Sequence, residues 1–283
     1  MILLVESGST NTHWRLISSQ NKQTRDFHSQ GINPYYQSIE EIELAQHSIL
    51  ENLCEEPIIE IHYYGTGITG DTEKLLLKSI FEKHFKKAQQ IIIKNDLESA
   101  AISTLGNDSG IACILGTGSN TGYFENGILT HQVPPLGFWL GDEGSGGHLG
   151  KSLVLAYLHK EMPIDIRELF IKRFGDLSRT DILHKAYKEE FPNRWFATFS
   201  KFLFDYRKHP FIYQIIQNSF ELFCEKYLLK YPQINQTKVH FTGSVAFYFS
   251  DILRKIVNKH GIIVGVISEN PMAGLTLHHK KYL

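Results

Sequence analysis

Apolar residues along the chain follow two spacings, short runs that are typical of strands and longer stretches with helical periodicity. Strand-like runs lie at Ile2 to Val5, Thr12 to Ile17, Thr24 to His28, Ile58 to Tyr64 and Gln90 to Lys94. Helical stretches lie around Ile39 to Leu53, Thr72 to Phe85 and Leu97 to Leu105. Strands that alternate with helices predict βαβ units and a mostly parallel sheet.

The same order of strand-like runs starts again further along, at Ile111 to Leu115, Thr121 to Phe124 and Ile128 to Gln132. The stretch from Glu143 to Tyr231 is mainly helical and rich in aromatic residues. The alternation then resumes with a strand at Lys238 to Thr242, a helix from Val245 to about His260 and a strand at Ile262 to Val266. We therefore expect an α/β protein with two domains, 1–108 and 109–283, and a helical insertion at about 143–231 in the second.

A short polar turn follows the first strand of each half, Ser7-Gly8-Ser9-Thr10 and Thr117-Gly118-Ser119-Asn120. Each turn lies between two strand-like runs, so each is predicted to close a hairpin. Gly, Ser and Thr at a tight turn offer backbone N–H groups and hydroxyls, which are the donors that a polyphosphate needs. Either turn alone could be an ordinary hairpin turn, but the repetition favours two phosphate-binding turns that hold one nucleotide in a cleft.

The composition favours a folded protein and narrows its partners. Of 283 residues, 42% are apolar, and the formal net charge of −1 leaves no electrostatic footprint for nucleic acid. Cys54, Cys113 and Cys224 are far apart, which argues for a reducing compartment and against a disulfide framework, a zinc site or an iron–sulfur cluster. Cys113 is predicted to be a core residue.

The chain shows no signal peptide and no transmembrane segment, which points to the cytoplasm. The histidines have no metal-ligand spacing, and His278-His279 is expected to belong to a solvated tail.

One glycine-rich segment, Gly65-Thr66-Gly67-Ile68-Thr69-Gly70, fits the G-x-G-x-x-G pattern of dinucleotide-binding turns. It does not lie in the first βα turn, and the acid that would bind the ribose, Asp96, follows Gly70 by 26 residues. Asp71 and Glu73 would also bring negative charge to the pyrophosphate. The pattern is therefore weak evidence, and dinucleotide binding is disfavoured.

Asn95 and Asp96 stand where a predicted strand ends and a predicted helix begins. Asn95 and Glu98 have the N-cap and N3 spacing of a capping box. This would leave Asp96 at the first helical position with its carboxylate free. Because ligands of open α/β sheets bind beyond the carboxyl ends of strands, the pattern leaves a catalytic and a structural role for Asp96 equally open.

Two more glycine-rich loops precede predicted helices. The loop from Gly137 to Gly147 has five glycines and the adjacent acids Asp142 and Glu143, a composition that suits a metal or polar ligand but that a structural loop can share. The segment Phe241 to Ala246 combines a strand, a Gly243-Ser244 turn and a helix whose N-terminus could accept an anion.

Taken in this order, the motifs resemble those of the acetate and sugar kinase, heat-shock-70 and actin superfamily. Within it they are similar to the N-acetylglucosamine kinase and BadF-type ATPase family. The matching segments are VESGSTNT, GINP, KNDLESAA, ILGTGSNT, LGDEGSGG, FTGSVA and NPMAGL. The resemblance extends over nearly the whole chain and implies two ribonuclease-H-like (actin-like ATPase) domains around a nucleotide cleft.

The resemblance also implies roles for individual residues. The ATP-binding positions would be Gly8, Ser9, Thr10 and Asn11 in the first turn, Gly116, Thr117 and Gly118 in the second, and Gly243 and Ser244 in the adenosine segment. The sugar-binding positions would be Asn33, Asp96, Ser119, Asn120, Gly137 and Asp142. Asp96 matches the catalytic Asp of the family. Glu6 falls where the magnesium-linked acid sits, and Asp142 would assist it through water.

The chain departs from the family pattern at two of these positions. Many relatives have Asp at the position of Glu6 and Lys at the position of Asn11, although Glu also occurs in animal N-acetylglucosamine kinases. The BadF-type activators carry an iron–sulfur cluster on paired cysteines, and this chain has no such pair.

We therefore expect an ATP-dependent kinase that acts on an amino sugar, N-acetylglucosamine or a related N-acetylhexosamine, with ATP and Mg²⁺ as cofactors. The expected partner is a small sugar, not nucleic acid or a membrane, and a homodimer is left open. The alternative is a non-catalytic sugar or nucleotide sensor with the same fold, because fold does not determine function.

Overall fold

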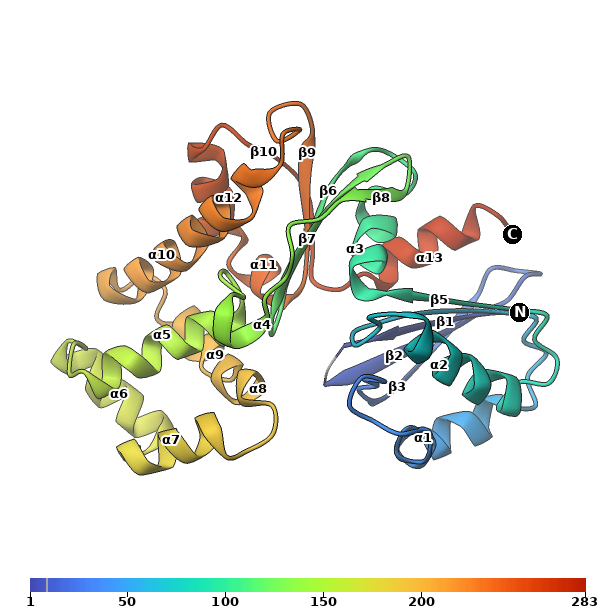
Figure 1. The fold of residues 1–283 in the computed structure, drawn as a ribbon, viewed down its shortest axis with the longest axis horizontal. Coiled ribbons are helices and arrows are strands. Elements are labelled where there is room, and N and C mark those ends of the chain that lie inside the picture. The colour runs from blue at the N-terminus through green and yellow to red at the C-terminus, as the bar shows by residue number, and fades with distance from the viewer. Residues whose placement is uncertain (9) are drawn as a thin grey trace. The chain divides into compact units, whose positions relative to one another are not determined.

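The computed structural model describes residues 1–8 and 10–283, which form two compact units. Unit 1 comprises Met1–Gly106 and Pro271–Leu283, and unit 2 comprises Asn107–Asn270. Each unit contains one five-stranded sheet with helices packed against it (Figure 1). The expected duplicated α/β fold is thereby confirmed.

The sheet of unit 1 has the order β3-β2-β1-β4-β5. Its strands are β1 (Ile2–Ser7), β2 (Asn11–Ile17), β3 (Thr24–Gln30), β4 (Glu60–Gly65) and β5 (Gln90–Asn95). Strands β1, β2 and β3 pair antiparallel, whereas β1, β4 and β5 pair parallel. The sheet is therefore mixed and not mostly parallel, because the unit opens with two hairpins.

Helices cover both faces of this sheet. They are α1 (Ile39–Leu53) and α2 (Asp71–His84) on one face, and α3 (Asp96–Thr104) and α13 (Met272–Lys280) on the other. Strand β1 is therefore buried on both faces. Leu3 and Val5 pack with apolar residues of α1 and α2, and Ile2 and Leu4 pack with those of α13. A strand that is buried on both faces reads as a continuous apolar run, which explains the sequence ILLV.

Unit 2 repeats the topology, with the sheet order β10-β9-β6-β7-β8. Its strands are β6 (Gly110–Leu115), β7 (Ser119–Glu125), β8 (Ile128–His131), β9 (Lys238–Thr242) and β10 (Ile263–Ser268). Strands β6, β7 and β8 pair antiparallel, and β6, β9 and β10 pair parallel, as in unit 1. Cys113 is fully buried in β6, as expected for a core residue.

A helical region separates β8 from β9. It contains α4 (Gly137–Leu140), α5 (Gly146–Leu158), α6 (Ile164–Phe174), α7 (Arg179–Tyr187), α8 (Pro192–Ala197), α9 (Ser200–Asp205), α10 (Pro210–Lys226) and the 3₁₀ turn Leu228–Lys230. The aromatic residues of the predicted insertion form its core, with stacked and edge-on pairs such as Phe170 with Phe199 and Phe202. The helical insertion is thus present.

The single helix expected from Val245 to about His260 is two helices, α11 (Ser244–Tyr248) and α12 (Ser250–Lys259). The backbone leaves helical geometry at Phe249, where φ is −102° and ψ is 21°. The Phe249 side chain is buried against the rings of Phe204 and Phe220. We attribute the break to this burial, which turns Phe249 into the core.

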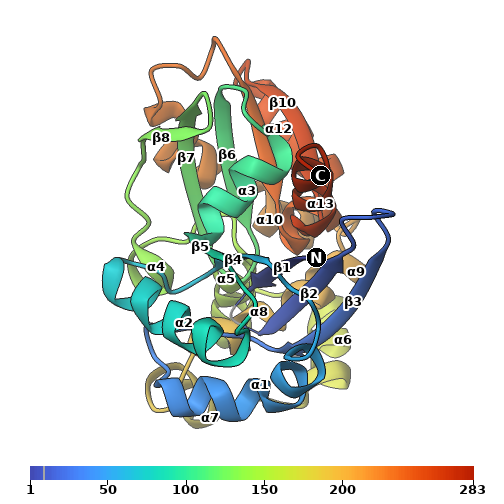
Figure 2. The ribbon, with the colours of Figure 1, turned by 90° about the vertical axis from the view of Figure 1, so that its right-hand side faces the viewer.

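The C-terminal segment differs most from the expectation. It forms α13, which lies beside α3 in unit 1 (Figure 2), so the second unit does not extend over the whole of 109–283. Met272 and Leu275 complete the core with Ile2 and Leu4. His279 is not in a solvated tail: it is only 7% exposed, and its Nε2 lies 2.9 Å from the hydroxyl of Tyr64.

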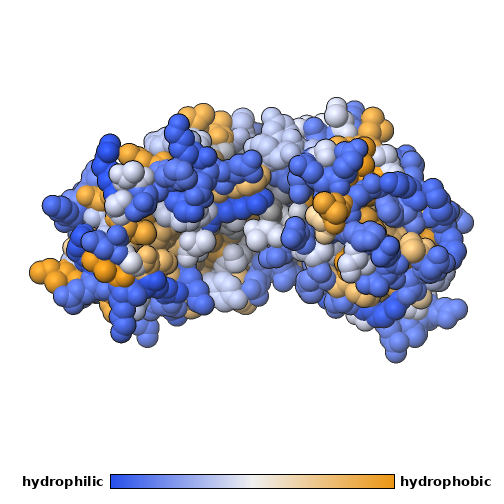
Figure 3. All heavy atoms as spheres, turned by 90° about the horizontal axis from the view of Figure 1, so that it is seen from below, coloured by the Kyte–Doolittle hydropathy of each residue, from blue (hydrophilic) through white to orange (hydrophobic). Residues whose placement is uncertain are grey.

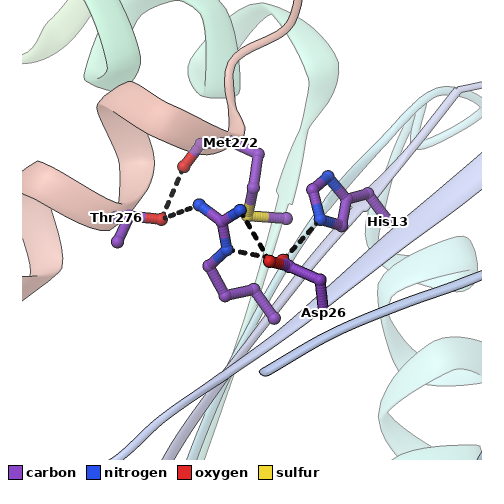
Figure 4. Close-up of polar contacts among 5 residues, drawn as sticks. His13, Asp26, Met272 and Thr276 are labelled. Carbon is purple, nitrogen blue, oxygen red and sulfur yellow. Dashed lines mark hydrogen bonds and ion pairs between the residues drawn. The ribbon is translucent and has the colours of Figure 1, made fainter. Parts of the chain in front are cut away.

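A polar network also holds α13 to the sheet (Figure 4). The Arg15 guanidinium donates to both carboxylate oxygens of Asp26, over 2.6 and 3.0 Å, and to the Thr276 hydroxyl over 3.0 Å. His13 Nε2 lies 2.7 Å from the same carboxylate. The Thr276 hydroxyl in turn donates to the carbonyl of Met272. One arginine therefore links β2, β3 and the C-terminal helix.

The molecular surface seen from below is mainly hydrophilic, with hydrophobic residues in separate patches (Figure 3). Among the residues that the structure describes, no helix has both the length and the apolar character that a membrane span requires.

Substitution Gly274→Ala tests the docking of α13. A methyl group at this position would clash with the backbone carbonyl of Ser103 in α3. We expect a loss of stability of about 1–3 kcal/mol, as for other overpacked sites, measured as a lower Tm. Leu277→Ala, an exposed change in the same helix, should alter stability by less than about 0.5 kcal/mol. Equal Tm values for the wild type and Gly274→Ala would contradict this packing.

Candidate functional site

Two carboxylates lie at one edge of the sheet in unit 1. Glu6 is near the end of β1, and Asp96 is the first residue of α3, directly after β5. Both β1 and β5 pair parallel with β4, with Glu6 and Lys94 each opposite Tyr64. The carboxyl ends of the three strands therefore meet at this edge, which is where ligands of open α/β sheets bind.

The predicted capping box at the start of α3 is confirmed. The Asn95 side chain accepts a hydrogen bond from the Glu98 N–H over 2.8 Å, and the Asn95 N–H donates to Glu98 Oε2 over 3.0 Å. These two residues supply the N-cap interactions, so the Asp96 carboxylate is not needed for the cap. Its position at the positive end of the helix dipole favours the ionised form.

Burial opposes ionisation of both carboxylates. Withdrawal from water, and then the charge of Asp96, raises the pKa of Glu6 from 4.5 to about 7. Withdrawal from water also raises the pKa of Asp96 from 3.8 to about 6, although the Leu97 N–H and the Thr66 hydroxyl act in the opposite direction. The pair therefore changes protonation near neutral pH, where a proton-transfer group is most effective.

The G-x-G-x-x-G segment contributes to this site and does not form a dinucleotide-binding turn. At Gly67, where φ is +75°, a side chain would clash with the Asn33 carboxamide. At Gly65, a Cβ atom would come within 2.5 Å of the Tyr63 hydroxyl. Protein side chains thus fill the space above these glycines. Thr66 and Gly67 are site residues that the sequence reasoning missed; the signal was a glycine-rich loop at the end of the strand next to β5.

Asn33, an expected sugar ligand, is held in a tight turn. Its Oδ1 accepts the Tyr35 N–H over 3.2 Å, and its own N–H donates to Gln37 Oε1 over 2.6 Å. The residue is 9% exposed. Among the residues that the structure describes, no hydrogen bond of its side-chain nitrogen is found.

The first phosphate turn joins β1 to β2. The Gly8 N–H donates to the Asn11 carbonyl over 3.0 Å, and the Thr10 carbonyl accepts the Gly31 N–H over 2.9 Å. The side chains of Thr10 and Asn11 are exposed. Ser9, which the sequence also places in this turn, lies outside the described residues.

The second phosphate turn, Gly116 to Gly118, lies in unit 2 against the start of α5. The N–H groups of Gly146 and Gly147 donate to the carbonyls of Gly116 and Thr117 over 2.8 and 3.0 Å. A Cβ atom at Gly147 would come within 3.0 Å of the Thr117 carbonyl. This close approach of helix and turn leaves little room for side chains at Gly146 and Gly147.

Gly243 closes the other side of the same turn. Its φ is +115°, and a side chain there would clash with the Leu115 carbonyl. Ser244, the other expected adenosine-segment residue, is exposed at the first position of α11. The structure therefore brings together the segment expected to bind adenosine and the second turn expected to bind phosphate.

Asp142 is buried beside this turn with its backbone in the left-handed region, at φ +60°. Its Oδ1 accepts the Ser119 N–H over 3.0 Å. Burial raises the pKa of Asp142, which the Ser119 N–H opposes. The Ser119 hydroxyl is buried without a hydrogen-bond partner among the described residues, so a group that a ligand could satisfy lies next to Asp142.

Gly137 and Asn120 are the remaining expected sugar ligands. Gly137, with φ +71°, begins α4 with open space around its α-carbon. The Asn120 side-chain oxygen accepts from the Thr121 N–H and from Gln132 Nε2, so both of its lone pairs are already used.

The expected site residues thus form two sets, one in each unit. Asp96 with Glu6 and Asn33 belongs to unit 1, and the second phosphate turn with Ser119 and Asp142 belongs to unit 2. The two expected metal-linked acids, Glu6 and Asp142, are therefore in different units. Over 1–8 and 10–283, no cluster of three or more His, Cys, Asp or Glu side chains could hold a metal ion by itself.

Solved structures share this fold over the full length of the chain. A protein from Porphyromonas gingivalis proposed to be an N-acetylglucosamine kinase is 35% identical, with a TM-score of 0.93 and 99% of each chain covered. A second such protein, from Chromobacterium violaceum, is 16% identical, with a TM-score of 0.72 and 98% of each chain covered.

A ROK family glucokinase from Streptomyces griseus, solved in complex with glucose and AMPPNP, is 12% identical, with a TM-score of 0.54. That match covers 98% of this chain and 97% of the glucokinase. No protein-family model and no curated protein matches the sequence.

The two-unit fold and the similar structures define the class, which is the sugar kinases with an actin-like ATPase fold. The 35% identity over nearly the whole length goes further. The chain belongs to the N-acetylglucosamine kinase and BadF-type ATPase family, as the sequence motifs indicated.

The raised pKa values of Glu6 and Asp96 make stability depend on pH. Both folded pKa values exceed the unfolded ones, so between about pH 4 and pH 7 the folded state binds more protons. The free energy of unfolding is therefore higher at low pH, and the contribution of this pair is lost as pH rises through that window. In Glu6→Gln, we expect the fall in Tm between pH 5 and pH 8 to shrink by about 2 °C or more relative to wild type.

The control for this measurement is Glu40→Gln, which changes an exposed carboxylate in α1. Its Tm should follow that of the wild type at each pH. If Glu6→Gln also retained the wild-type pH dependence, Glu6 would ionise in the folded state as freely as in the unfolded chain.

Proposed function

We propose that this chain transfers the γ-phosphoryl group of ATP to a hydroxyl group of an amino sugar, N-acetylglucosamine or a related N-acetylhexosamine. The observation that carries the proposal is the Asp96 carboxylate, held at the carboxyl edge of a sheet with a pKa of about 6 and free of the helix cap beside it. The membership of the family supports the choice of sugar.

In this reaction Asp96 acts as the general base. Its carboxylate accepts the proton of the attacking sugar hydroxyl as the bond to phosphorus forms, which a carboxylate with a pKa near 6 can do at neutral pH. The Leu97 N–H and the Thr66 hydroxyl favour its ionised form. Phosphoryl transfer depends mainly on positioning and electrostatics, so few protein groups are needed.

The residues fit a Mg²⁺ ion that is bound mostly by nucleotide phosphates and water. Mg²⁺ commonly takes only one or two protein carboxylates, and Glu6 is a carboxylate whose charge is destabilised by burial and by Asp96. When bound with ATP, the ion supplies positive charge that shields the phosphates. Glu6 would hold its water shell, and Asp142 is the second candidate for that task.

The two turns supply the donors for the nucleotide in this proposal. Gly8, Thr10 and Asn11, together with Ser9, would contribute backbone and side-chain groups in unit 1. Gly116, Thr117 and Gly118 would do so in unit 2, with Gly243 and Ser244 next to the adenosine. Backbone N–H groups at such turns bind phosphate without a lysine, which is consistent with Asn11 in place of the Lys of many relatives.

Three groups with unused hydrogen-bonding capacity suit a sugar. The Asn33 carboxamide offers N–H donors, the Ser119 hydroxyl is unpartnered among the described residues, and Asp142 accepts only one bond from Ser119 at Oδ1. Asn120 and Gly137 would complete the sugar-binding set. A buried hydroxyl without a partner is costly, so a sugar group that forms a hydrogen bond with Ser119 would stabilise it.

A panel assay tests the proposal against its alternative. ATP consumption is measured with N-acetylglucosamine, N-acetylmannosamine, N-acetylgalactosamine, glucose and no sugar. We expect turnover with an N-acetylhexosamine and little with glucose. A sensor would bind sugar or ATP in calorimetry with no turnover for any sugar, and that result would reject the kinase proposal.

Asp96→Asn should lower kcat by about 10²-fold or more, the usual scale for loss of a general base, while ATP binding changes little. The matched control is Asp71→Asn, which makes the same change at the first position of α2, where the carboxylate is exposed. Its kcat should stay within about twofold. Comparable kcat values for the two variants would remove Asp96 from the mechanism.

The pH dependence of kcat/KM gives an independent test. The base must be unprotonated, so the rate should fall about tenfold per pH unit below an apparent pKa near 6. This value belongs to the Glu6–Asp96 pair, because the two groups interact. A profile that stays flat down to pH 4.5 would show that no such group controls the rate.

A further inference from the structure

One cation lies beside the loop that carries Asp142. Lys151 is on α5, one turn after Gly147, and its side chain is half-buried. Its Nζ donates to the Phe138 carbonyl over 3.2 Å and stands 4.9 Å from the centre of the Phe138 ring. Burial lowers the pKa of this lysine, while the charges of Glu143 and Asp142 act to raise it. Burial thus destabilises the charged ammonium group, and the negative charges of Glu143 and Asp142 counteract that effect.

The loop between α4 and α5 needs such support, because its backbone is unusual. Asp142 and Gly144 have φ angles of +60° and +80°, and Gly137, which begins α4 before the loop, has +71°. A non-glycine residue such as Asp142 adopts this conformation only where the surroundings hold it. The loop is fixed on one side by the Tyr227 hydroxyl, which donates to Glu143 Oε2 over 2.9 Å.

Lys151 and Phe138 provide the support on the other side. The Phe138 ring is buried against Gly147, where a Cβ atom would come within 3.1 Å of it, and stacks on Phe196. Lys151 holds the carbonyl of the same phenylalanine and brings positive charge next to Asp142 and Glu143. Phe138 lies within α4, whose Gly141 N–H donates to the Gly137 carbonyl over 2.8 Å. The cation thus links α5 to Phe138 in α4 and brings positive charge near the acids of the following loop.

We propose that Lys151 is a positioning residue for the sugar: through the Phe138 carbonyl and the charge of Asp142, it holds the segment Gly137 to Asp142 in the geometry that binds the substrate. This inference rests on the proposed sugar-binding role of Asp142, with Glu6 as the acid linked to Mg²⁺. It predicts that loss of the cation weakens sugar binding and leaves the chemical step and the nucleotide nearly unaffected. Lys151 itself contacts neither substrate nor reacting atoms in this role.

The kinetic test compares Lys151→Met, Lys151→Arg and Lys172→Met, which removes an exposed lysine of α6. In Lys151→Met, the KM for the sugar should rise by about 10-fold, the scale for loss of one charge-assisted hydrogen bond. The kcat and the KM for ATP should change by less than about threefold, and Lys151→Arg should recover most of the sugar affinity. Equal losses for sugar and ATP, or no loss for the sugar, would overturn the proposal.

Amide hydrogen exchange provides a measurement that needs no turnover. The Ser119 N–H donates to Asp142 Oδ1, so its exchange rate reports whether Asp142 keeps its place. We expect the amides of Ser119 and Gly141 to exchange about 10-fold faster in Lys151→Met than in Lys172→Met, with the Tm of the two variants similar. Unchanged exchange at both amides would contradict the positioning role. A wild-type protein that phosphorylates no sugar would contradict the proposed function instead, and the exchange rates would then decide on Lys151 alone.

Discussion

The site in unit 1 is shaped by the repulsion between the partly buried carboxylates of Glu6 and Asp96 at one sheet edge. Placing two carboxylates there costs free energy, which the raised pKa values of about 7 and about 6 express. Their neighbours limit that cost only in part. Asp96 has the N-terminus of α3, the Leu97 N–H and the Thr66 hydroxyl, while Glu6 is opposed by burial and by Asp96 itself. Such an arrangement is retained at functional sites more than elsewhere, because it adjusts a pKa toward the working pH.

The two units have the same strand order but use it differently. In unit 1 the hairpin turn lies beside the carboxylate pair and the glycine-rich loop. The side chains of Tyr63 and Asn33 fill the space that Cβ atoms at Gly65 and Gly67 would occupy. In unit 2 the corresponding turn is joined by backbone hydrogen bonds to the start of a long helix, and the nearby acid, Asp142, is held by Ser119 and neighboured by Lys151. One topology thus carries a carboxylate pair in one unit and, in the other, a turn held by backbone hydrogen bonds to a helix.

Local patterns predicted much of this structure. The hairpins around the two turns follow from short apolar runs on both sides of Gly-Ser or Gly-Thr, and the helix of residues 39–53 follows from its periodicity. The free position of Asp96 follows from the spacing of Asn95 and Glu98. In each case the residues that determine the structure are close in the sequence.

The misses depend on contacts between distant residues. His279 is buried because Tyr64 and His62 lie on a strand more than two hundred residues earlier, which no local pattern reveals. The role of Thr66 depends on the parallel pairing of β4 with β5, and the break at Phe249 depends on rings from α9 and α10. The glycines of the G-x-G-x-x-G segment were also ambiguous, since the sequence shows that a side chain is absent but not what fills its place.

The most direct test is a carbon-detected NMR titration of the Glu6 and Asp96 carboxyl groups in the protein without ligands. The structure predicts that the pair titrates with apparent pKa values of about 7 and about 6, well above those of exposed carboxylates. Addition of Mg²⁺ with a nucleotide analogue should lower the value for Glu6. If both carboxyl groups titrated below about pH 5, the desolvated pair would not exist in solution. Asp96 would then lack the raised pKa that suits a general base at neutral pH.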